Sequence, residues 1–206
     1  MKILLTNDDG IFAEGIHALY RSLASWTSVY VVAPEQERSA MGHAITMHKP
    51  LHAKETVFES EASGHAWAVN GTPVDCTKLG IEALLPSRPD LLLSGINRGA
   101  NLGRDVFYSG TVSAAMEGMF LGVPSIALSY DDGDEEGFAW VADFVSWWLQ
   151  QPSFVMPPQQ ILYNINFPSL KKKTPGKMVA VRLGNRHYVN DFHRRLDPRG
   201  QEYFWL

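Results

Sequence analysis

The first ten residues, MKILLTNDDG (1–10), decide the fold, because a short apolar run ends abruptly in two carboxylates and a glycine. The apolar run at positions 3–5 predicts a buried strand that leads directly into a turn. In an α/β sheet, ligands bind just beyond the carboxyl ends of the strands. Asp8 and Asp9 are therefore expected where such a protein keeps its chemistry, although Asp-Gly and Asn-Asp are also ordinary turn sequences.

Strand and helix patterns alternate from this stretch onward. Helical patterns open at Gly15, at Thr72-Pro73 and at Ser109, and an acidic run at 134–136 marks a fourth helix start. No firm element is expected over 44–63. A strand-helix-strand unit crosses over with a right-handed turn, which makes its two strands parallel. The pattern predicts an α/β fold with a mostly parallel sheet flanked by helices. The expected strands cover residues 29–33, 66–69, 90–94, 123–128, 161–165 and 178–183.

The composition changes at Gly184. The last residues are rich in arginine, histidine and aromatic side chains, with a Pro-Arg-Gly turn at 198–200. This pattern predicts a β-hairpin or arm that extends from the main sheet. We expect residues 1–183 to form the α/β catalytic domain and residues 184–206 to form an extension. An aromatic arm at a chain end is more often an oligomer contact than a catalytic part.

Bulk properties narrow the classes of function. The chain has 206 residues and a formal net charge of −4, which argues against nucleic-acid binding as its main task. Its single cysteine, Cys76, allows no disulfide framework and is expected in the core. The lysines at 171–173 fit a solvated turn. No stretch is long and apolar enough to span a bilayer, so a soluble, cytoplasmic protein without membrane or nucleic-acid partners is predicted.

Three of the predicted strands are followed by polar loops that should meet at one edge of the sheet. The first loop supplies Asp8 and Asp9, the second supplies Ser39, and the third supplies Asn97 and Asn101. Carboxylate, amide and hydroxyl oxygens form a shell that fits magnesium, manganese or calcium and fits zinc poorly. The pattern therefore predicts a divalent metal site, with water completing the coordination.

A possible anion site stands beside these loops. Ser109-Gly110-Thr111 begins a helix, where free backbone N–H groups and the helix dipole favour an anion. The alternative is a plain N-cap, with Ser109 serving only its own helix. Glycines at 95, 99 and 103 permit tight turns next to it. A metal beside a phosphate-sized anion site indicates phosphoryl transfer to water.

Other catalytic motifs are absent from the sequence. It contains no P-loop, no GxGxxG fingerprint, no GxSxG nucleophile elbow and no HExxH. Among the histidines only His43 lies in the loop of Ser39, and we expect a structural role for it rather than general-acid catalysis.

Five motifs, in this order, resemble the SurE family of survival-protein nucleotidases. They are LTNDDG (5–10), VAPEQERS (32–39), GTPVDC (71–76), SGINRGANLG (94–103) and YSGTVSAAMEG (108–118). The resemblance implies a Rossmann-like core with an extended hairpin, and dimers or tetramers formed through such arms. It also implies that family members continue past the hairpin through a further acidic loop and strand, whereas this chain ends at Leu206.

The resemblance further implies a metal-dependent phosphatase that acts on nucleoside 5′- or 3′-monophosphates, with some members also trimming short polyphosphate. One divalent cation per subunit would be held at positions matching Asp8, Asp9, Ser39 and Asn97. The phosphate would be held at positions matching Asn101, Ser109, Gly110 and Thr111.

Direct hydrolysis is the mechanism we expect, with Asp8 or Asp9 orienting or deprotonating the attacking water. In a variant of this scheme, one aspartate attacks phosphorus and forms an acyl phosphate. Two other functions stay open. A haloacid-dehalogenase-like phosphatase would need two aspartates separated by one residue, whereas here they are adjacent. A sensor would bind metal and nucleotide without turnover.

Overall fold

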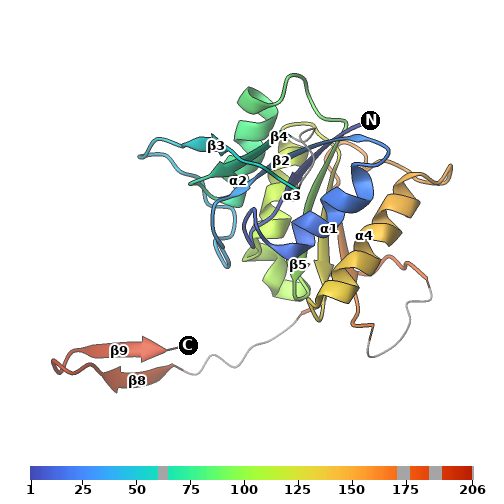
Figure 1. The fold of residues 1–206 in the computed structure, drawn as a ribbon. Coiled ribbons are helices and arrows are strands. Elements are labelled where there is room, and N and C mark those ends of the chain that lie inside the picture. Colours follow the sequence, from blue (N-terminus) through green and yellow to red (C-terminus); the bar gives the residue numbers. More distant parts are fainter. Residues whose placement is uncertain (60–64, 171–176, 186–191, 206) are drawn as a thin grey trace.

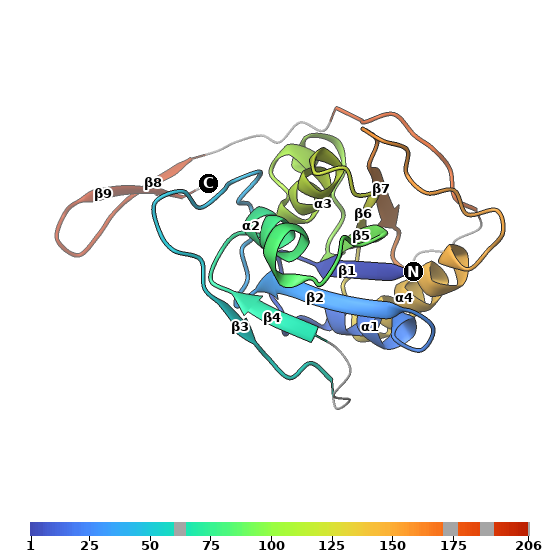
Figure 2. The ribbon, with the colours of Figure 1, turned by 90° about the horizontal axis from the view of Figure 1, so that it is seen from above.

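A mostly parallel sheet forms the centre of the protein (Figure 2). The computed structural model describes residues 1–59, 65–170, 177–185 and 192–205. Within them, seven strands form one sheet in the order β3-β4-β2-β1-β5-β6-β7, and only β3 is antiparallel to its neighbour. The six parallel strands follow the doubly wound, Rossmann-like order. The strands are β1 (Lys2–Thr6), β2 (Ser28–Pro34), β3 (Ala53–Glu55), β4 (His65–Val69), β5 (Leu91–Arg98), β6 (Ser125–Tyr130) and β7 (Tyr163–Phe167).

Helices cover both faces of this sheet (Figure 1). On one face lie α1 (Glu14–Leu23) and α4 (Glu135–Leu149). On the other lie α2 (Pro73–Leu79), its π-helical continuation (Gly80–Leu84) and α3 (Gly110–Phe120). Alternate residues of a strand point to opposite faces. In β1, Leu5 packs toward α1 and α4, and Leu4 packs toward α2 and α3. Because both faces are buried, the strands read as continuous apolar runs, and the predicted α/β class is confirmed.

N-cap residues set the starts of α2 and α4. Thr72 caps α2, and its side chain accepts a hydrogen bond from the N–H of Asp75 while the Asp75 carboxylate accepts one from the N–H of Thr72. Asp134 caps α4 by accepting from the Gly137 N–H at 2.8 Å. Each of these bonds satisfies a backbone donor that the first helical turn leaves without a partner. The predicted helix starts are thus confirmed to within one residue.

Several predicted details are wrong. Residues 178–183 form no strand and are exposed, since among the described residues no strand lies beside them to pair with. The strand predicted to end at Ser94 continues as β5 to Arg98, because it pairs with β6 again after a bulge. Part of the predicted loop that follows is a 3-10 helix, Gly103–Phe107. A short strand, β3, lies within 44–63.

The carboxyl-terminal hairpin is present. Strands β8 (His193–Leu196) and β9 (Glu202–Trp205) pair antiparallel as a separate two-stranded sheet, and all their residues are exposed. Figure 1 shows the hairpin set apart from the helical layers. The predicted hairpin is confirmed. The lysines at 171–173 lie outside the described residues. In the described part of the chain, no helix has the length and apolar character needed to cross a membrane.

Candidate functional site

The strand order reverses between β1 and β5, and a crevice opens beyond their carboxyl ends. Asp8 and Asp9 follow β1, and Asn97 lies at the end of β5. The loop after β2 is tied to the same place, since the Arg38 N–H donates to the Asp8 carbonyl oxygen at 2.7 Å. The Ile11 N–H also donates to the Pro34 carbonyl oxygen at 2.8 Å. The fold therefore brings together three loops that are far apart in the sequence.

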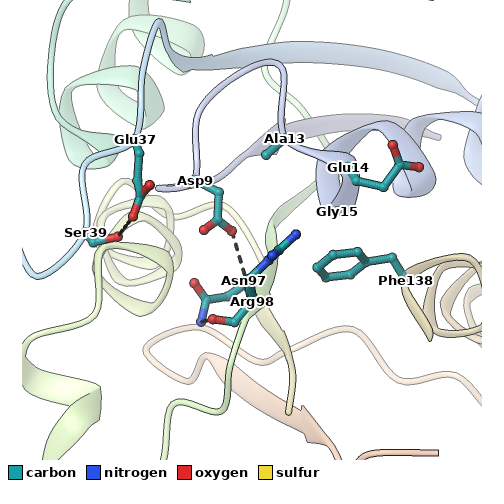
Figure 3. A pocket seen from close by; sticks show the side chains of 9 residues that line it. All are labelled: Asp9, Ala13, Glu14, Gly15, Glu37, Ser39, Asn97, Arg98 and Phe138. Carbon is teal, nitrogen blue, oxygen red and sulfur yellow. Dashed lines mark hydrogen bonds between the residues drawn. The ribbon is translucent and has the colours of Figure 1, made fainter. Parts of the chain in front are cut away.

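A pocket of about 330 Å³ lies among these loops (Figure 3). Three of the four predicted metal ligands, Asp9, Ser39 and Asn97, line it. The fourth, Asp8, is buried and is not among the lining residues. The lining residues are Asp9, Ala13, Glu14, Gly15, Glu37, Ser39, Asn97, Arg98 and Phe138.

The polar side chains of the pocket are oriented by short local hydrogen bonds. The Asn97 Nδ2 donates to the Gly99 carbonyl oxygen at 2.7 Å, which turns the amide nitrogen toward its own loop. Figure 3 shows the amide oxygen on the side of Asp9. The Ser39 hydroxyl donates to Glu37 Oε1 at 2.6 Å, so its oxygen keeps lone pairs to offer elsewhere. Both groups thus present oxygen acceptors to the pocket.

Glu37 is a site residue that the sequence pattern did not single out. Its carboxylate lines the pocket and accepts a hydrogen bond from the Ser39 hydroxyl. The only signal in the sequence was an acid two residues before Ser39 in a loop that carries another glutamate at position 35. Periodicity cannot tell which of two loop acids turns inward.

The Asp9 carboxylate is crowded by other negative charges. Its pKa is raised from 3.8 to about 7, first by burial and then by the charges of Asp8 and Glu37. The backbone N–H of Arg98, which approaches Asp9 Oδ2 at 3.4 Å, and the charge of that arginine act in the opposite direction. A divalent cation near Asp9 would remove the repulsion that these carboxylates exert on one another.

Asp8 faces the first turn of α3. The Thr111 hydroxyl donates to Asp8 Oδ1, and a Cβ on Gly110 would lie 2.7 Å from the Asp8 Cβ. Burial raises the pKa of Asp8, while hydrogen bonds from the Thr111 side chain and from the backbone of Thr111 and Gly110 act against that rise. The positive end of the helix, which the sequence predicts as a phosphate site, therefore holds the Asp8 carboxylate here.

Ser109 is placed as the N-cap of α3. Its hydroxyl oxygen accepts from the Val112 N–H at 3.1 Å, and its carbonyl oxygen accepts from the Ser113 hydroxyl at 2.7 Å. The alternative that the tripeptide serves its own helix thus describes Ser109 in this structure. Gly110 and Thr111 contact Asp8, and none of Ser109, Gly110 and Thr111 lines the pocket.

Asn101 is buried and held by a network of amides. Its Nδ2 donates to Ser129 Oγ at 2.9 Å, and its backbone N–H donates to Asn166 Oδ1 at 2.7 Å. Asn164 Nδ2 donates to the Asn101 carbonyl oxygen at 3.0 Å. Asn164 and Asn166 point to one side of β7 because they are two residues apart. Sequence reasoning missed both, although the Asn-Ile-Asn spacing at a strand end was visible.

His43 joins the loop of Ser39 to helix α3. Its Nε2 lies 2.8 Å from Glu117 Oε2, and the Lys78 Nζ donates to Glu117 Oε1 at 2.9 Å. Burial alone would raise the pKa of Glu117, but the bonds from His43 and Lys78 outweigh it and the pKa is lowered. These contacts agree with the structural role expected for His43.

The donor set fits a hard divalent cation. Within the residues that the structure describes, no three His, Cys, Asp or Glu side chains gather as metal ligands. The pocket instead combines carboxylate, hydroxyl and amide oxygens, which suit magnesium, manganese or calcium. Its nine lining residues include three carboxylates and one cation, so the pocket carries excess negative charge.

Comparisons with known proteins agree on one family. The profile of the family described as "Survival protein SurE" matches residues 3–190. The "5'-nucleotidase SurE" of Moorella thermoacetica is 52% identical over 209 residues, covering 100% of this chain and 79% of that protein. The "5'-nucleotidase SurE" of Pelotomaculum thermopropionicum is 50% identical, covering 100% and 78%. The crystal structure of the SurE protein from Aquifex aeolicus superposes with a TM-score of 0.78 at 39% identity, covering 100% and 81%.

Proposed function

The chain belongs to the SurE family, and from this membership we propose that it is a 5′-nucleotidase that uses one divalent cation per subunit. Its substrates are nucleoside 5′-monophosphates, with 3′-monophosphates and short polyphosphate as further substrates. Relatives at about 50% identity carry the name 5'-nucleotidase. With the family known, the haloacid-dehalogenase-like alternative has no support.

One observation carries the metal-dependent part of this proposal. Asp9 and Ser39, from the loops after β1 and β2, and Asn97, at the end of β5, present oxygen atoms to the same pocket. They would hold the cation together with Asp8, whose carboxylate is adjacent in the chain. Bound there, a divalent cation polarises the phosphoryl group and lowers the pKa of water.

Asp9 is the group that we propose takes the proton of the attacking water. It lines the pocket, so its carboxylate can reach a water held there. As the water oxygen bonds to phosphorus, its proton passes to the Asp9 carboxylate and the phosphorus–oxygen ester bond breaks. The leaving oxygen takes a proton from solvent. Asp8, buried against Thr111, orients the first turn of α3 rather than the water.

The remaining phosphate oxygens are assigned to the loop of Asn101 and the start of α3, at Ser109, Gly110 and Thr111. The family resemblance supports this assignment. In the structure none of these four residues lines the pocket, and Gly110 and Thr111 pack against Asp8. Phosphate binding at this place would therefore require the Asp8 carboxylate to share the helix start with the substrate.

Phosphate release from a panel of nucleoside 5′- and 3′-monophosphates tests the proposal. Release is expected with magnesium or manganese and is lost in chelator. Asp9→Asn is expected to lose most activity while folding normally, and the exposed Glu82→Asn serves as the control that keeps it. If the protein binds nucleotide and metal but releases no phosphate under any condition, it is a sensor and the nucleotidase proposal fails. Trapping of a phosphorylated aspartate would replace the water route by the acyl-phosphate variant.

We also propose that the chain consists of a catalytic domain and an oligomerisation arm. Residues 1–183 form the catalytic α/β domain, and residues 184–206 form an arm that contacts another subunit in a homodimer or homotetramer. The exposed apolar side chains of β8 and β9 support this role for the arm. A cytoplasmic location stays a prediction of the sequence.

A further inference from the structure

Arg98 is the one cation among the nine residues that line the pocket. Figure 3 shows its side chain between Asp9 and Phe138, on the wall of the pocket next to Asn97. Nothing in the sequence pattern assigned a role to this arginine. Its position in a pocket that otherwise carries Asp9, Glu14 and Glu37 calls for an explanation.

The root of the Arg98 side chain is fixed. Arg98 pairs with Tyr130 where β5 and β6 end, and the backbone N–H of Arg98 approaches Asp9 Oδ2. Its aliphatic stem lies directly on the backbone of Gly133, where a Cβ would come within 2.3 Å of the Arg98 Cγ. A guanidinium on such a stem can reach only nearby space, and Arg98 is among the residues that line the pocket.

The guanidinium itself is exposed and has no carboxylate partner in the described part of the chain. Glu14, which shares the pocket, pairs instead with Arg21 on the next turns of α1. Arg21 also pairs with Glu59 at 3.1 Å. The charge of Arg98 lowers the pKa of Asp9, but its guanidinium forms no salt bridge in the described part of the chain, so its donors remain available to a ligand.

The charge of the pocket indicates which ligand these donors suit. A phosphate monoester is a dianion, and the pocket carboxylates would repel it. A guanidinium presents a planar fork of N–H donors that matches two phosphate oxygens at once. Arginine in that position both binds the oxygens and offsets the repulsion from Asp9 and Glu37, even when a cation neutralises part of their charge.

We propose that Arg98 donates from its guanidinium to the non-bridging oxygens of the substrate phosphate, as a binding residue additional to the metal ligands and the start of α3. This inference rests on the proposed phosphomonoesterase function. Arg98 would hold the phosphoryl group on the side of Asp9 and keep phosphorus within reach of the water that Asp9 activates. The same contact would bind the product, inorganic phosphate.

The test compares Arg98→Met, which keeps the stem on Gly133 and removes the donors, with Arg98→Lys and with Arg88→Met. Arg88 is exposed and precedes β5, at the opposite edge of the sheet, so it is the matched control. Binding of inorganic phosphate is measured by calorimetry on the manganese-loaded protein. Manganese affinity is measured separately by electron paramagnetic resonance, because a merely structural change would disturb it too.

In Arg98→Met, the dissociation constant for inorganic phosphate and the KM for nucleoside monophosphate should each rise about 10- to 100-fold. Manganese affinity and the unfolding midpoint should stay at the wild-type values. Arg98→Lys should recover part of the loss, and Arg88→Met should behave like the wild type. Wild-type phosphate affinity in Arg98→Met, or a parallel loss of manganese binding, would overturn the inference. If the wild type binds phosphate through Arg98 but releases none from any nucleotide, the nucleotidase proposal fails and the Arg98 contact stands.

Discussion

Asp8 and Asp9 are adjacent in the chain, yet their carboxylates occupy different environments. Asp8 is buried against the first turn of α3, where Thr111 and the backbone of Gly110 donate to it. Asp9 faces the pocket and is repelled by Asp8 and Glu37. Two neighbouring acids with different surroundings can take different roles, which supports our proposal that Asp9 rather than Asp8 takes the proton of the attacking water.

The first prediction concerns the stability cost of Asp9. Its pKa of about 7 in the folded protein lies above the ordinary value of 3.8. Between these two pH values the unfolded chain therefore binds fewer protons than the folded protein, and the free energy of unfolding falls as pH rises from about 4 to 7. Without divalent cations, Asp9→Asn should be more stable than the wild type at pH 8, by an amount on the order of 2 kcal/mol after allowance for solvent screening. Urea unfolding in chelator at pH 4 and pH 8 measures the difference.

The gain from Asp9→Asn should be much smaller at pH 4, where the wild-type carboxyl is protonated in the folded state and roughly 40% protonated in the unfolded state. Glu55→Gln, a change at an exposed acid on β3, is the control and should show no such pH dependence. Equal stability of Asp9→Asn and the wild type at pH 8 would contradict the crowding of carboxylates at this site.

A second prediction concerns Gly110, which has no room for a side chain. A Cβ there would lie 2.7 Å from the Asp8 Cβ and 2.8 Å from Asp8 Oδ2. Gly110→Ala should push Asp8 away from α3, at a cost of about 1–3 kcal/mol in stability. Activity should drop about 100-fold, because small misplacements in a catalytic site are expensive. Steady-state kinetics and thermal unfolding measure both effects. Gly184→Ala, where a Cβ would meet open space, is the control; equal activity in both variants would refute the close packing of Asp8.

At the residue scale, the sequence predicted those site residues that carry side-chain oxygen atoms and stand just after, or at the end of, a strand. Asp9, Ser39 and Asn97 fall into that class and do line one pocket. It did not predict Glu37 or Arg98, because their roles depend on which way a loop side chain turns. It also could not separate Asp8 from Asp9, since their difference comes from α3, which lies a hundred residues away in the chain.

At the scale of elements, the buried Glu117 of α3 connects the loop of Ser39 to helices α3 and α2. Glu117 on α3 binds His43 of that loop and Lys78 of α2. A second tie lies nearby, since the buried Asp75 accepts from both the N–H and the hydroxyl of Thr46. The loop that carries Ser39 is thus attached to the helical layer at two points beyond the site.

We predict that Glu117→Gln loosens this attachment. The lowered pKa of Glu117 means that its carboxylate stabilises the fold above the ordinary value of 4.5 and that this contribution is lost as pH falls through the lower folded pKa. The variant should lose about 1–3 kcal/mol at pH 7 and much less at pH 3. Denaturant unfolding at the two pH values measures the difference, and the exposed Glu82→Gln serves as the control. A loss of the same size at both pH values would show that packing, rather than the charge, is what Glu117 supplies.

The elements themselves followed from the sequence where local signals and burial agreed. Thr72-Pro73 and Ser109 fixed two helix starts, and the apolar runs fixed β1, β2 and β6. The failures share one cause, which is that pairing is not local. Residues 178–183 alternate as a strand would but have no described partner, whereas Asn97 and Arg98 look like part of a loop and yet pair with β6.

At the scale of the whole molecule, the site exists because of the order of the strands. Chain segments that leave β1 and β5 go to opposite sides of the sheet, and this reversal leaves space between them for the pocket. The hairpin of β8 and β9 takes no part in that sheet. It exposes large apolar side chains, with Phe204 and Trp205 at 59% and 61% exposure, which a protein surface rarely leaves without a partner.

The last prediction follows from these exposed side chains. If the hairpin is an arm that binds a second subunit, Phe204→Glu combined with Trp205→Glu should convert the oligomer into monomers, because two charges would be placed in an apolar contact. Light scattering after size-exclusion chromatography measures the mass of each species. Val57→Glu, a change at a side chain that is 86% exposed, should leave the wild-type mass unchanged. A wild-type protein that is monomeric, or a double variant with the oligomer's mass, would remove the arm from the interface. The pocket, built entirely from residues before 139, should keep its metal affinity in the monomer.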